Sequence, residues 1–304
     1  MTRMFTSAAT VAVIATAAIA MSAPTAVNAQ AAVPTGKWPT SAGNAKPRAE
    51  PILVKKGEVF DGKMQTFQRS NVKCVGNGSK EGDMNTAMFV VEAGGTLKNV
   101  IIGKDQREGV HCDEHDCRLE NVWWDDVCED ALSVKGGSAK SVTRVVGGGA
   151  RFADDKVVQH NGLGTVHIEG FFVQNFGKLY RSCGNGGCGV GRQRHVTLTN
   201  IYAVNPKTSI VTVNQNNGDT AKLKNVFIKS SKGSKTQVCV WSEAVTKGEP
   251  DMLGEGPKGT LCQYNAATDI HFGSPPGAVA RVRQLGEDKG ENDLDSYASF
   301  NVTA

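Results

Sequence analysis

A short apolar segment returns in this chain about once every 22 to 30 residues. The segments are rich in β-branched and aromatic residues at strand spacing, and each is followed by glycine, asparagine, aspartate or charged residues typical of turns. Their starts lie 22, 23, 26, 30 and 25 residues apart: LKNVII (97–102), LENVWW (119–124), VTRVVG (142–147), IEGFFV (168–173), LTNIYA (198–203) and LKNVFI (223–228). A period of this length predicts a solenoid, in which each coil stacks on the previous one.

Helical periodicity of useful length is absent, so each repeat must be built from strands. An antiparallel sandwich usually has turn signals every ~8 to 12 residues, whereas this motif returns once per repeat. We therefore predict an all-β fold, a right-handed parallel β-helix, over residues 51–272. Asn99, Asn121, Asn200 and Asn225 occupy the same place in four of the six units. Stacked asparagines can hydrogen-bond one another, so we expect a structural ladder rather than a ligand site.

Residues 1–29 have the features of a secretory signal peptide. Arg3 supplies a positive start, Ala8–Met21 is apolar, and small residues precede an expected cleavage after Ala29. The apolar run is too short for a transmembrane helix, which needs ~20 apolar residues, and no later segment approaches that length. We therefore expect a secreted, extracellular protein with no membrane partner.

Two further segments flank the predicted domain. Residues 30–50 lack periodicity and contain alanine, proline, glycine and lysine, which predicts a flexible lead-in. Residues 273–304 contain paired prolines and the charged run GEDKGEND, which predicts a disordered tail. We expect the single domain between them to act as a monomer.

Eight cysteines indicate disulfides, because the thiols of an exported protein are commonly oxidised. The expected pairs are Cys112–Cys117, Cys183–Cys188, Cys239–Cys262 and, by elimination, Cys74–Cys128. His111 and His115 beside the first pair also suggest zinc, an alternative that secretion disfavours.

The net charge of +4 permits an acidic partner without requiring one. Nucleic acid is excluded as a partner, because the basic residues are dispersed, aromatic residues are scarce and the chain is predicted to be exported. Asn77 and Asn301 begin glycosylation sequons, which matter only in a eukaryotic source.

Charged residues recur with a period close to that of the apolar segments. The clusters follow one another about every 22 to 26 residues: Glu108, Glu129-Asp130, Asp155-Lys156, and Lys178 with Arg181. A solenoid would place these clusters on one face, acids beside bases. Such a face suits metal-assisted proton abstraction.

Six motifs in order carry a family resemblance. They are VKKGEVFDG (54–62), LKNVIIG (97–103), EGVHC (108–112), ENVWWDDVCEDALSVKG (120–136), DKVVQHNG (155–162) and FGKLYRSCGNGGC (176–188). Together they closely resemble the short-β-helix pectate lyases of the third polysaccharide-lyase family, over roughly Ile52 to Glu243. The double Trp, CEDA and KLYRSC look most like fungal or oomycete members.

The resemblance implies calcium on the flank of the helix, held by carboxylates. Glu129 and Asp130 match the calcium-binding pair of the family, and Glu108 falls where many members have aspartate. The longer side chain departs from that pattern and is expected to alter the coordination distance, although glutamate still supplies oxygen ligands that suit calcium.

The resemblance also implies a substrate cleft. Asp155-Lys156 matches an Asp-Lys pair of the family, and Lys178 and Arg181 match its basic pair. Glu81 or Asp83 corresponds to an acidic residue near the cleft.

Polygalacturonate carries a carboxylate on every sugar, and a lyase removes the proton on the adjacent carbon. We predict Lys156 as the base, because neighbouring positive charge and desolvation would lower its pKa; Arg181 is its rival. Lys178 and Arg181 would hold sugar carboxylates, and Lys135, five residues beyond Asp130, is expected to line the cleft.

The sequence thus predicts a calcium-dependent pectate lyase that cleaves de-esterified homogalacturonan to 4,5-unsaturated products. One alternative is a polygalacturonate hydrolase, which would use two carboxylates and need neither calcium nor the lysines. The other is a non-catalytic, pectin-binding β-helix protein.

Overall fold

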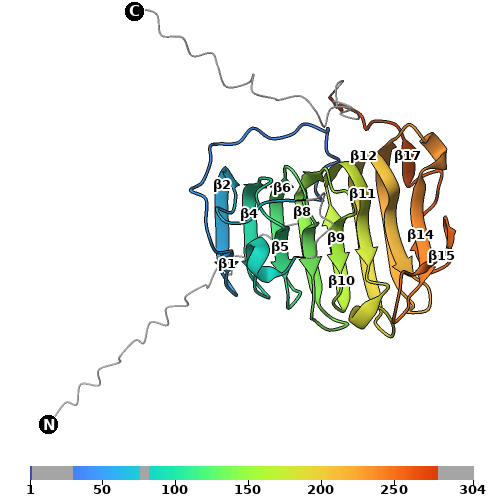
Figure 1. Cartoon of the computed structure of the whole chain (residues 1–304), viewed down its shortest axis with the longest axis horizontal. Coiled ribbons are helices and arrows are strands. Elements are labelled where there is room, and N and C mark those ends of the chain that lie inside the picture. The colour runs from blue at the N-terminus through green and yellow to red at the C-terminus, as the bar shows by residue number, and fades with distance from the viewer. Residues whose placement is uncertain (2–29, 76–81, 280–304) are drawn as a thin grey trace, which may run out of the picture.

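The computed structural model describes Met1 and residues 30–75 and 82–279. Within them the chain winds into successive coils, so that strands from neighbouring repeats lie side by side (Figure 1). The predicted signal peptide, both sequons, Glu81 and most of the predicted tail lie outside the described residues. Over residues 30–75 and 82–279 no helix has the length and apolarity to cross a membrane.

The first ladder of strands forms one face of the solenoid. It contains β1 (Ile52–Val54), β3 (Ala87–Val91), β5 (Glu108–Cys112), β7 (Asp130–Val134), β9 (Lys156–His160), the end of β11 (Phe172–Ser182), the end of β12 (Arg194–Asn214) and β14 (Gln237–Glu243). These strands pair in parallel. β15 (Asp251–Glu255) joins β14 antiparallel at the last coil.

The second ladder supplies the other faces. It contains β2 (Val59–Phe67), β4 (Thr96–Ile102), β6 (Arg118–Trp124), β8 (Val142–Arg151), β10 (Gly164–Glu169), the starts of β11 and β12, β13 (Thr220–Lys229), β16 (Cys262–Gln263) and β17 (Ile270–Phe272). The helices of the described part are the short 3₁₀ turns η1 (Met84–Thr86), η2 (Gly186–Cys188) and η3 (Gly233–Lys235). The predicted parallel β-helix is confirmed.

Matching apolar side chains stack inside the solenoid from one coil to the next. Between β4 and β6, Leu97 pairs with Leu119, Val100 with Val122 and Ile102 with Trp124, all of them buried. Each strand buries an apolar set at a spacing of two or three residues, and the next coil repeats it. The apolar repeat in the sequence is therefore the core seen one coil at a time.

Asparagines turn the chain sharply in the middle of the long strands. Asn121 has a φ of 53°, and Asn99, Asn200 and Asn225 adopt the same left-handed conformation. Asn121 Nδ2 donates to Asn99 Oδ1 at 2.9 Å, and Asn225 Nδ2 donates to Asn200 Oδ1 at 2.6 Å. The predicted asparagine ladder is thus confirmed, and its backbone role explains the choice of residue, since asparagine tolerates this conformation well.

The coils between the two asparagine pairs use glycine at the same corner. Leu119 pairs with Val145 rather than with Val142, and Ile168 also pairs with Val145. The alignment of VTRVVG at Val142 is therefore wrong by three residues. Gly147 and Gly170, with φ of 67° and 63°, then take the asparagine place.

Replacing Asn121 with alanine is expected to lower the free energy of unfolding by about 1–3 kcal/mol, because alanine tolerates a left-handed φ less well than asparagine and the ladder loses hydrogen bonds. Asn121 also accepts a hydrogen bond from Trp123 Nε1 at 2.7 Å. Denaturant unfolding measures the loss. Asn121→Gly is the matched control, since glycine relieves the backbone and loses only the side-chain bonds; an alanine variant no less stable than the glycine variant contradicts the backbone argument.

All eight cysteines form disulfides, and the pairing is the expected one: Cys74–Cys128, Cys112–Cys117, Cys183–Cys188 and Cys239–Cys262. With Cys112 and Cys117 joined, neither offers a thiolate to zinc.

Residues 30–50 pack along the outside of the coils. Trp38 meets Trp123 edge-on with ring centroids 4.8 Å apart, and the Arg151 guanidinium lies 4.4 Å from the centre of the Trp38 ring. Asn200 Nδ2 donates to the carbonyl of Ala31 at 2.6 Å. Contacts made by single side chains leave no periodicity in the sequence, which is why composition alone predicts a flexible lead-in here.

Candidate active site

An open cleft of about 500 Å³ lies on the outer face of the first ladder. The charged residues that line it are Glu108, Glu129, Asp130, Lys135, Asp155, Lys156, Lys178, Arg181 and Glu249. Parallel pairing without a shift places Asp130, Lys156 and Lys178 opposite one another on β7, β9 and β11. The charged clusters of the sequence therefore do share one face.

Three acidic side chains meet at one end of this cleft. Glu108, Glu129 and Asp130 each offer a carboxylate oxygen within 4.8 Å of the others, and all three residues are buried. Glu129 Oε2 accepts no hydrogen bond from the residues that the structure describes. Asp130 Oδ1 also accepts none there, but it forms an ion pair with Lys156 Nζ, 3.3 Å away. Buried carboxylate oxygens with so few hydrogen bonds fit a hard cation such as Ca²⁺, which prefers oxygen ligands.

The pKa values of these acids reflect their crowding. Burial, opposed by attraction to Lys156 and reinforced by repulsion from Glu108, raises the pKa of Glu129 to about 7. Burial also raises the pKa of Asp130 well above its ordinary value. Burial acts on Glu108 in the same sense, but hydrogen bonding and charge attraction from His111 lower the pKa of Glu108 overall. Negative charge on Glu129 and Asp130 is therefore unfavourable without a further cation.

Lys156 lies among carboxylates. Its Nζ is 3.0 Å from Glu129 Oε1, 3.3 Å from Asp130 Oδ1 and 2.9 Å from Asp155 Oδ2. Burial alone would lower the pKa of this ammonium, but the three carboxylates raise it above its ordinary value. The expectation of cationic surroundings that lower this pKa is therefore wrong, because the strand register sets Lys156 directly beside Asp130.

Glu108 is held by His111, which the sequence suggested only as a possible zinc ligand, and by Ser133, which it did not single out. His111 Nε2 lies 3.3 Å from Glu108 Oε2, and its Nδ1 lies 2.8 Å from Asp113 Oδ1. Ser133 Oγ donates to Glu108 Oε2 at 3.0 Å. A side chain on Gly82 would come within 2.5 Å of Glu108 Cγ, so this glycine makes room for a glutamate at this position. His111 lies within the EGVHC motif, and this motif was the sequence feature that could have identified it as a residue of the site.

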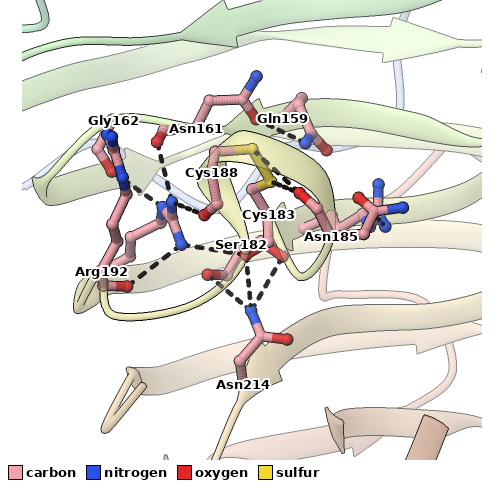
Figure 2. Close-up of a disulfide and its surroundings, with 12 residues drawn as sticks. Gln159, Asn161, Gly162, Ser182, Cys183, Asn185, Cys188, Arg192 and Asn214 are labelled. Carbon is pink, nitrogen blue, oxygen red and sulfur yellow. Dashed lines mark hydrogen bonds between the residues drawn. A yellow bond between two sulfur atoms is a disulfide. The ribbon is translucent and has the colours of Figure 1, made fainter. Parts of the chain in front are cut away.

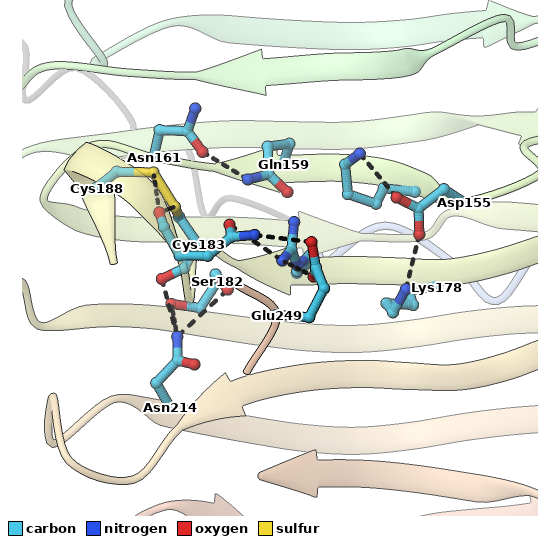
Figure 3. Close-up of polar contacts among 12 residues, drawn as sticks. Asp155, Gln159, Asn161, Lys178, Ser182, Cys183, Cys188, Asn214 and Glu249 are labelled. Carbon is cyan, nitrogen blue, oxygen red and sulfur yellow. Dashed lines mark hydrogen bonds and ion pairs between the residues drawn. A yellow bond between two sulfur atoms is a disulfide. The ribbon is translucent and has the colours of Figure 1, made fainter. Parts of the chain in front are cut away.

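Asp155 bridges two lysines across the cleft, as Figure 3 shows for Asp155 and Lys178. Its Oδ1 is 2.7 Å from Lys178 Nζ, and its Oδ2 contacts Lys156. Although burial favours the neutral acid, the two lysines lower the pKa of Asp155 to about 2. The acidic and basic clusters thus form one network.

Arg181 lies on the coil beyond Lys156 and is mostly buried, with 15 % of its side chain exposed. Its Nη2 donates to Asn185 Oδ1 at 3.3 Å and lies 3.6 Å from Glu249 Oε2. Asn185 Nδ2 in turn donates to Glu249 Oε1 at 3.1 Å. Within the described part of the chain, Arg181 Nε and Nη1 make no hydrogen bond, which leaves these donors for an anion in the cleft.

The cleft ends at the loop closed by Cys183–Cys188 (Figure 2). Asn214 Nδ2 donates to the carbonyls of Ser182 and Cys183, which fixes the start of this loop. The buried Arg194 donates to the carbonyls of Gly162, Cys183, Arg192, Asn161 and Cys188. These contacts hold the wall of the cleft in place.

Three further residues were predicted for the site, namely Lys135 and either Glu81 or Asp83. Lys135 lines the cleft, and its Nζ is 4.0 Å from Asp113 Oδ1. Glu81 falls outside the described residues. Asp83, its alternative, accepts hydrogen bonds from the backbone of Asn85 and Thr86 and thereby caps η1.

A parallel β-helix with buried carboxylates, lysines and an arginine in one open cleft fits the class of polysaccharide lyases. Residues 35–249 match the family model described as Pectate lyase, and the chain belongs to that family.

Similar proteins and similar solved structures also bear the name pectate lyase. "Probable pectate lyase D" of Emericella nidulans is 50 % identical over 209 residues, which cover 68 % of this chain and 75 % of the relative. "Probable pectate lyase E" of Aspergillus clavatus is 47 % identical over 244 residues, which cover 80 % of this chain and 89 % of the relative. The crystal structure of pectate lyase PelI from Erwinia chrysanthemi with tetragalacturonic acid matches with a TM-score of 0.59 and 32 % identity, over 72 % of this chain and 70 % of that one.

Proposed function

We propose that this protein is a secreted, calcium-dependent pectate lyase that cleaves de-esterified homogalacturonan by β-elimination. The observation that carries the proposal is the contact of Lys156 with the buried cluster of Glu108, Glu129 and Asp130, with Arg181 in the same cleft. The four disulfides support an extracellular location. We further propose that it acts as a monomer.

The three acids would hold calcium, and the buried Glu129 Oε2, which accepts no hydrogen bond from the described residues, supports this role. Calcium held by these acids would supply positive charge that offsets the sugar carboxylate and the acids around Lys156. His111 and Ser133 keep the Glu108 carboxylate in position.

Lys178 and Arg181 would hold sugar carboxylates. The planar guanidinium of Arg181 suits a bidentate hydrogen-bonded pair with a carboxylate. Lys178 would exchange its contact with Asp155 for a sugar carboxylate or share it between the two. Both side chains line the cleft on the coil next to Lys156, so the sugars would lie across the strands.

Lys156 is the proposed base. Its Nζ is fixed by Glu129, Asp130 and Asp155 at the border between the acidic and basic residues of the cleft. It must lose its proton before it can accept one from the sugar carbon, and the surrounding carboxylates oppose that loss. Neutralisation of those carboxylates is therefore part of the proposal, and Arg181 remains the rival base.

The test is an incubation with polygalacturonate in which ultraviolet absorbance of the 4,5-unsaturated product is followed. We expect absorbance to rise with added calcium, to stop with a chelator and to rise poorly on methyl-esterified pectin, whose esters bind neither calcium nor Arg181 as an anion does. Activity that a chelator leaves unchanged contradicts the calcium dependence. New reducing ends without absorbance indicate a hydrolase. The absence of both new reducing ends and absorbance indicates a non-catalytic pectin-binding protein.

A further inference from the structure

Gln159 carries a buried hydrogen-bond acceptor that no described residue uses. The residue lines the cleft and is 7 % exposed. Its Nε2 donates to Asn161 Oδ1 at 2.6 Å, whereas its Oε1 accepts no hydrogen bond from the described part of the chain. Because a buried amide oxygen without a donor is unfavourable, this atom is suited to a donor that arrives with the substrate.

The strand register places Gln159 beside the anion-binding side chains. It pairs with Ser133 on β7 and with Arg181 on β11, and neighbouring strands lie about 4.8 Å apart. Figure 3 shows Gln159 between the Cys183–Cys188 disulfide and the contact of Asp155 with Lys178. A sugar whose carboxylate is bound by Arg181 would therefore have its ring close to the Gln159 amide.

The chemistry of the polymer limits what can meet this oxygen. In a 4-linked galacturonate chain the carboxylate, ring oxygen and glycosidic oxygens only accept hydrogen bonds. The hydroxyls at C2 and C3 are the donors. An amide oxygen repels a carboxylate and binds a hydroxyl.

We propose that Gln159 accepts a hydrogen bond from the C2 or C3 hydroxyl of the sugar bound by Arg181, and so selects sugars that are not acetylated at that hydroxyl. The inference rests on the proposed function. An acetyl ester replaces the donor with a carbonyl acceptor, which faces the Gln159 oxygen unfavourably and is also bulkier. Acetylation thus becomes a second modification that this cleft rejects, independent of methyl esterification.

The test compares polygalacturonate with its chemically acetylated form, both with free C6 carboxylates. We expect Gln159→Met to lower kcat/KM on the unmodified polymer about three- to tenfold, the range for one lost neutral hydrogen bond, and to change kcat/KM on the acetylated polymer much less. The ratio of kcat/KM on unmodified polymer to kcat/KM on acetylated polymer therefore falls. The control is Gln237→Met, since Gln237 lies on β14 outside the cleft and contacts Met252 Sδ. A Gln159→Met enzyme with the wild-type preference overturns the proposal.

A second measurement needs no variant. The wild-type protein digests partially acetylated polygalacturonate, and mass spectrometry locates acetyl groups on the sugars next to the cleaved bonds. We expect one such position to lack acetyl groups, and an even distribution contradicts the role of Gln159. If the wild type releases no unsaturated product at all, the proposed function fails instead, so the two failures are distinguishable.

Discussion

Replacing Lys156 with methionine is expected to lower kcat on polygalacturonate about a hundred- to ten-thousandfold, the usual contribution of a general base. Binding of the polymer should remain, because Lys178 and Arg181 still line the cleft. The loss should appear in kcat rather than in KM. Ultraviolet absorbance measures turnover, and affinity gel electrophoresis in polygalacturonate measures binding.

Lys207→Met is the matched control for this experiment. Lys207 pairs with Asp154 at 2.5 Å, is 54 % exposed and does not line the cleft. Its loss should leave turnover unchanged, since exposed ion pairs contribute little. Calcium should be present at saturation in both cases, because methionine at position 156 leaves Glu129 and Asp130 without their ion-pair partner. A Lys156→Met enzyme with wild-type kcat transfers the role of base to Arg181.

The sequence predicts the solenoid well because the core repeats once per coil. Leu97, Leu119, Leu198 and Leu223 all begin units that the structure keeps in register. The third unit is misplaced by three residues: its corner residue is Gly147, so it lacks the asparagine that marks the corner in four of the units, and valine stands at both Val142 and Val145. An apolar pattern fixes which residues lie inside, but a slip of three residues still places valine where valine belongs.

The charged residues of the site follow from the same repeat. Glu129, Asp130, Lys156 and Arg181 fall together because parallel coils keep equivalent positions adjacent. The contacts among these residues cannot be predicted from the repeat, since only the structure shows that Lys156 contacts three carboxylates. Neutral residues such as Gln159 are harder still, because a sequence gives no sign of which amide is buried beside a cleft without a partner.

Calcium is expected to raise the melting temperature most at neutral and alkaline pH, because of Glu129. The folded-state pKa of Glu129 is about 7, above its ordinary value of 4.5. A raised pKa means that this carboxyl favours the folded state fully below about pH 4.5 and loses that contribution as pH rises through about 7. The chelated protein should therefore lose stability over this range. Burial lowers the pKa of His160, so His160 has the opposite effect: the folded protein loses stability as pH falls below about 6.5.

Glu129→Gln tests the contribution of Glu129, since it removes that titrating carboxyl and leaves Asp130, whose pKa burial also raises, and His160 in place. With calcium at 100 times its Kd, the wild type should gain about 2.7 kcal/mol near pH 8, or roughly 5–10 °C for a domain of this size. The gain should shrink at pH 5, where protonated Glu129 offers a poorer ligand. In Glu129→Gln the calcium-induced shift should be small at both pH values, and the chelated variant should lose less stability between pH 5 and pH 7. Scanning calorimetry of both proteins at each pH, with and without chelator, measures these shifts. A wild-type calcium shift that is as large at pH 5 as at pH 8, or that survives in Glu129→Gln, places the calcium away from the cluster of Glu108, Glu129 and Asp130.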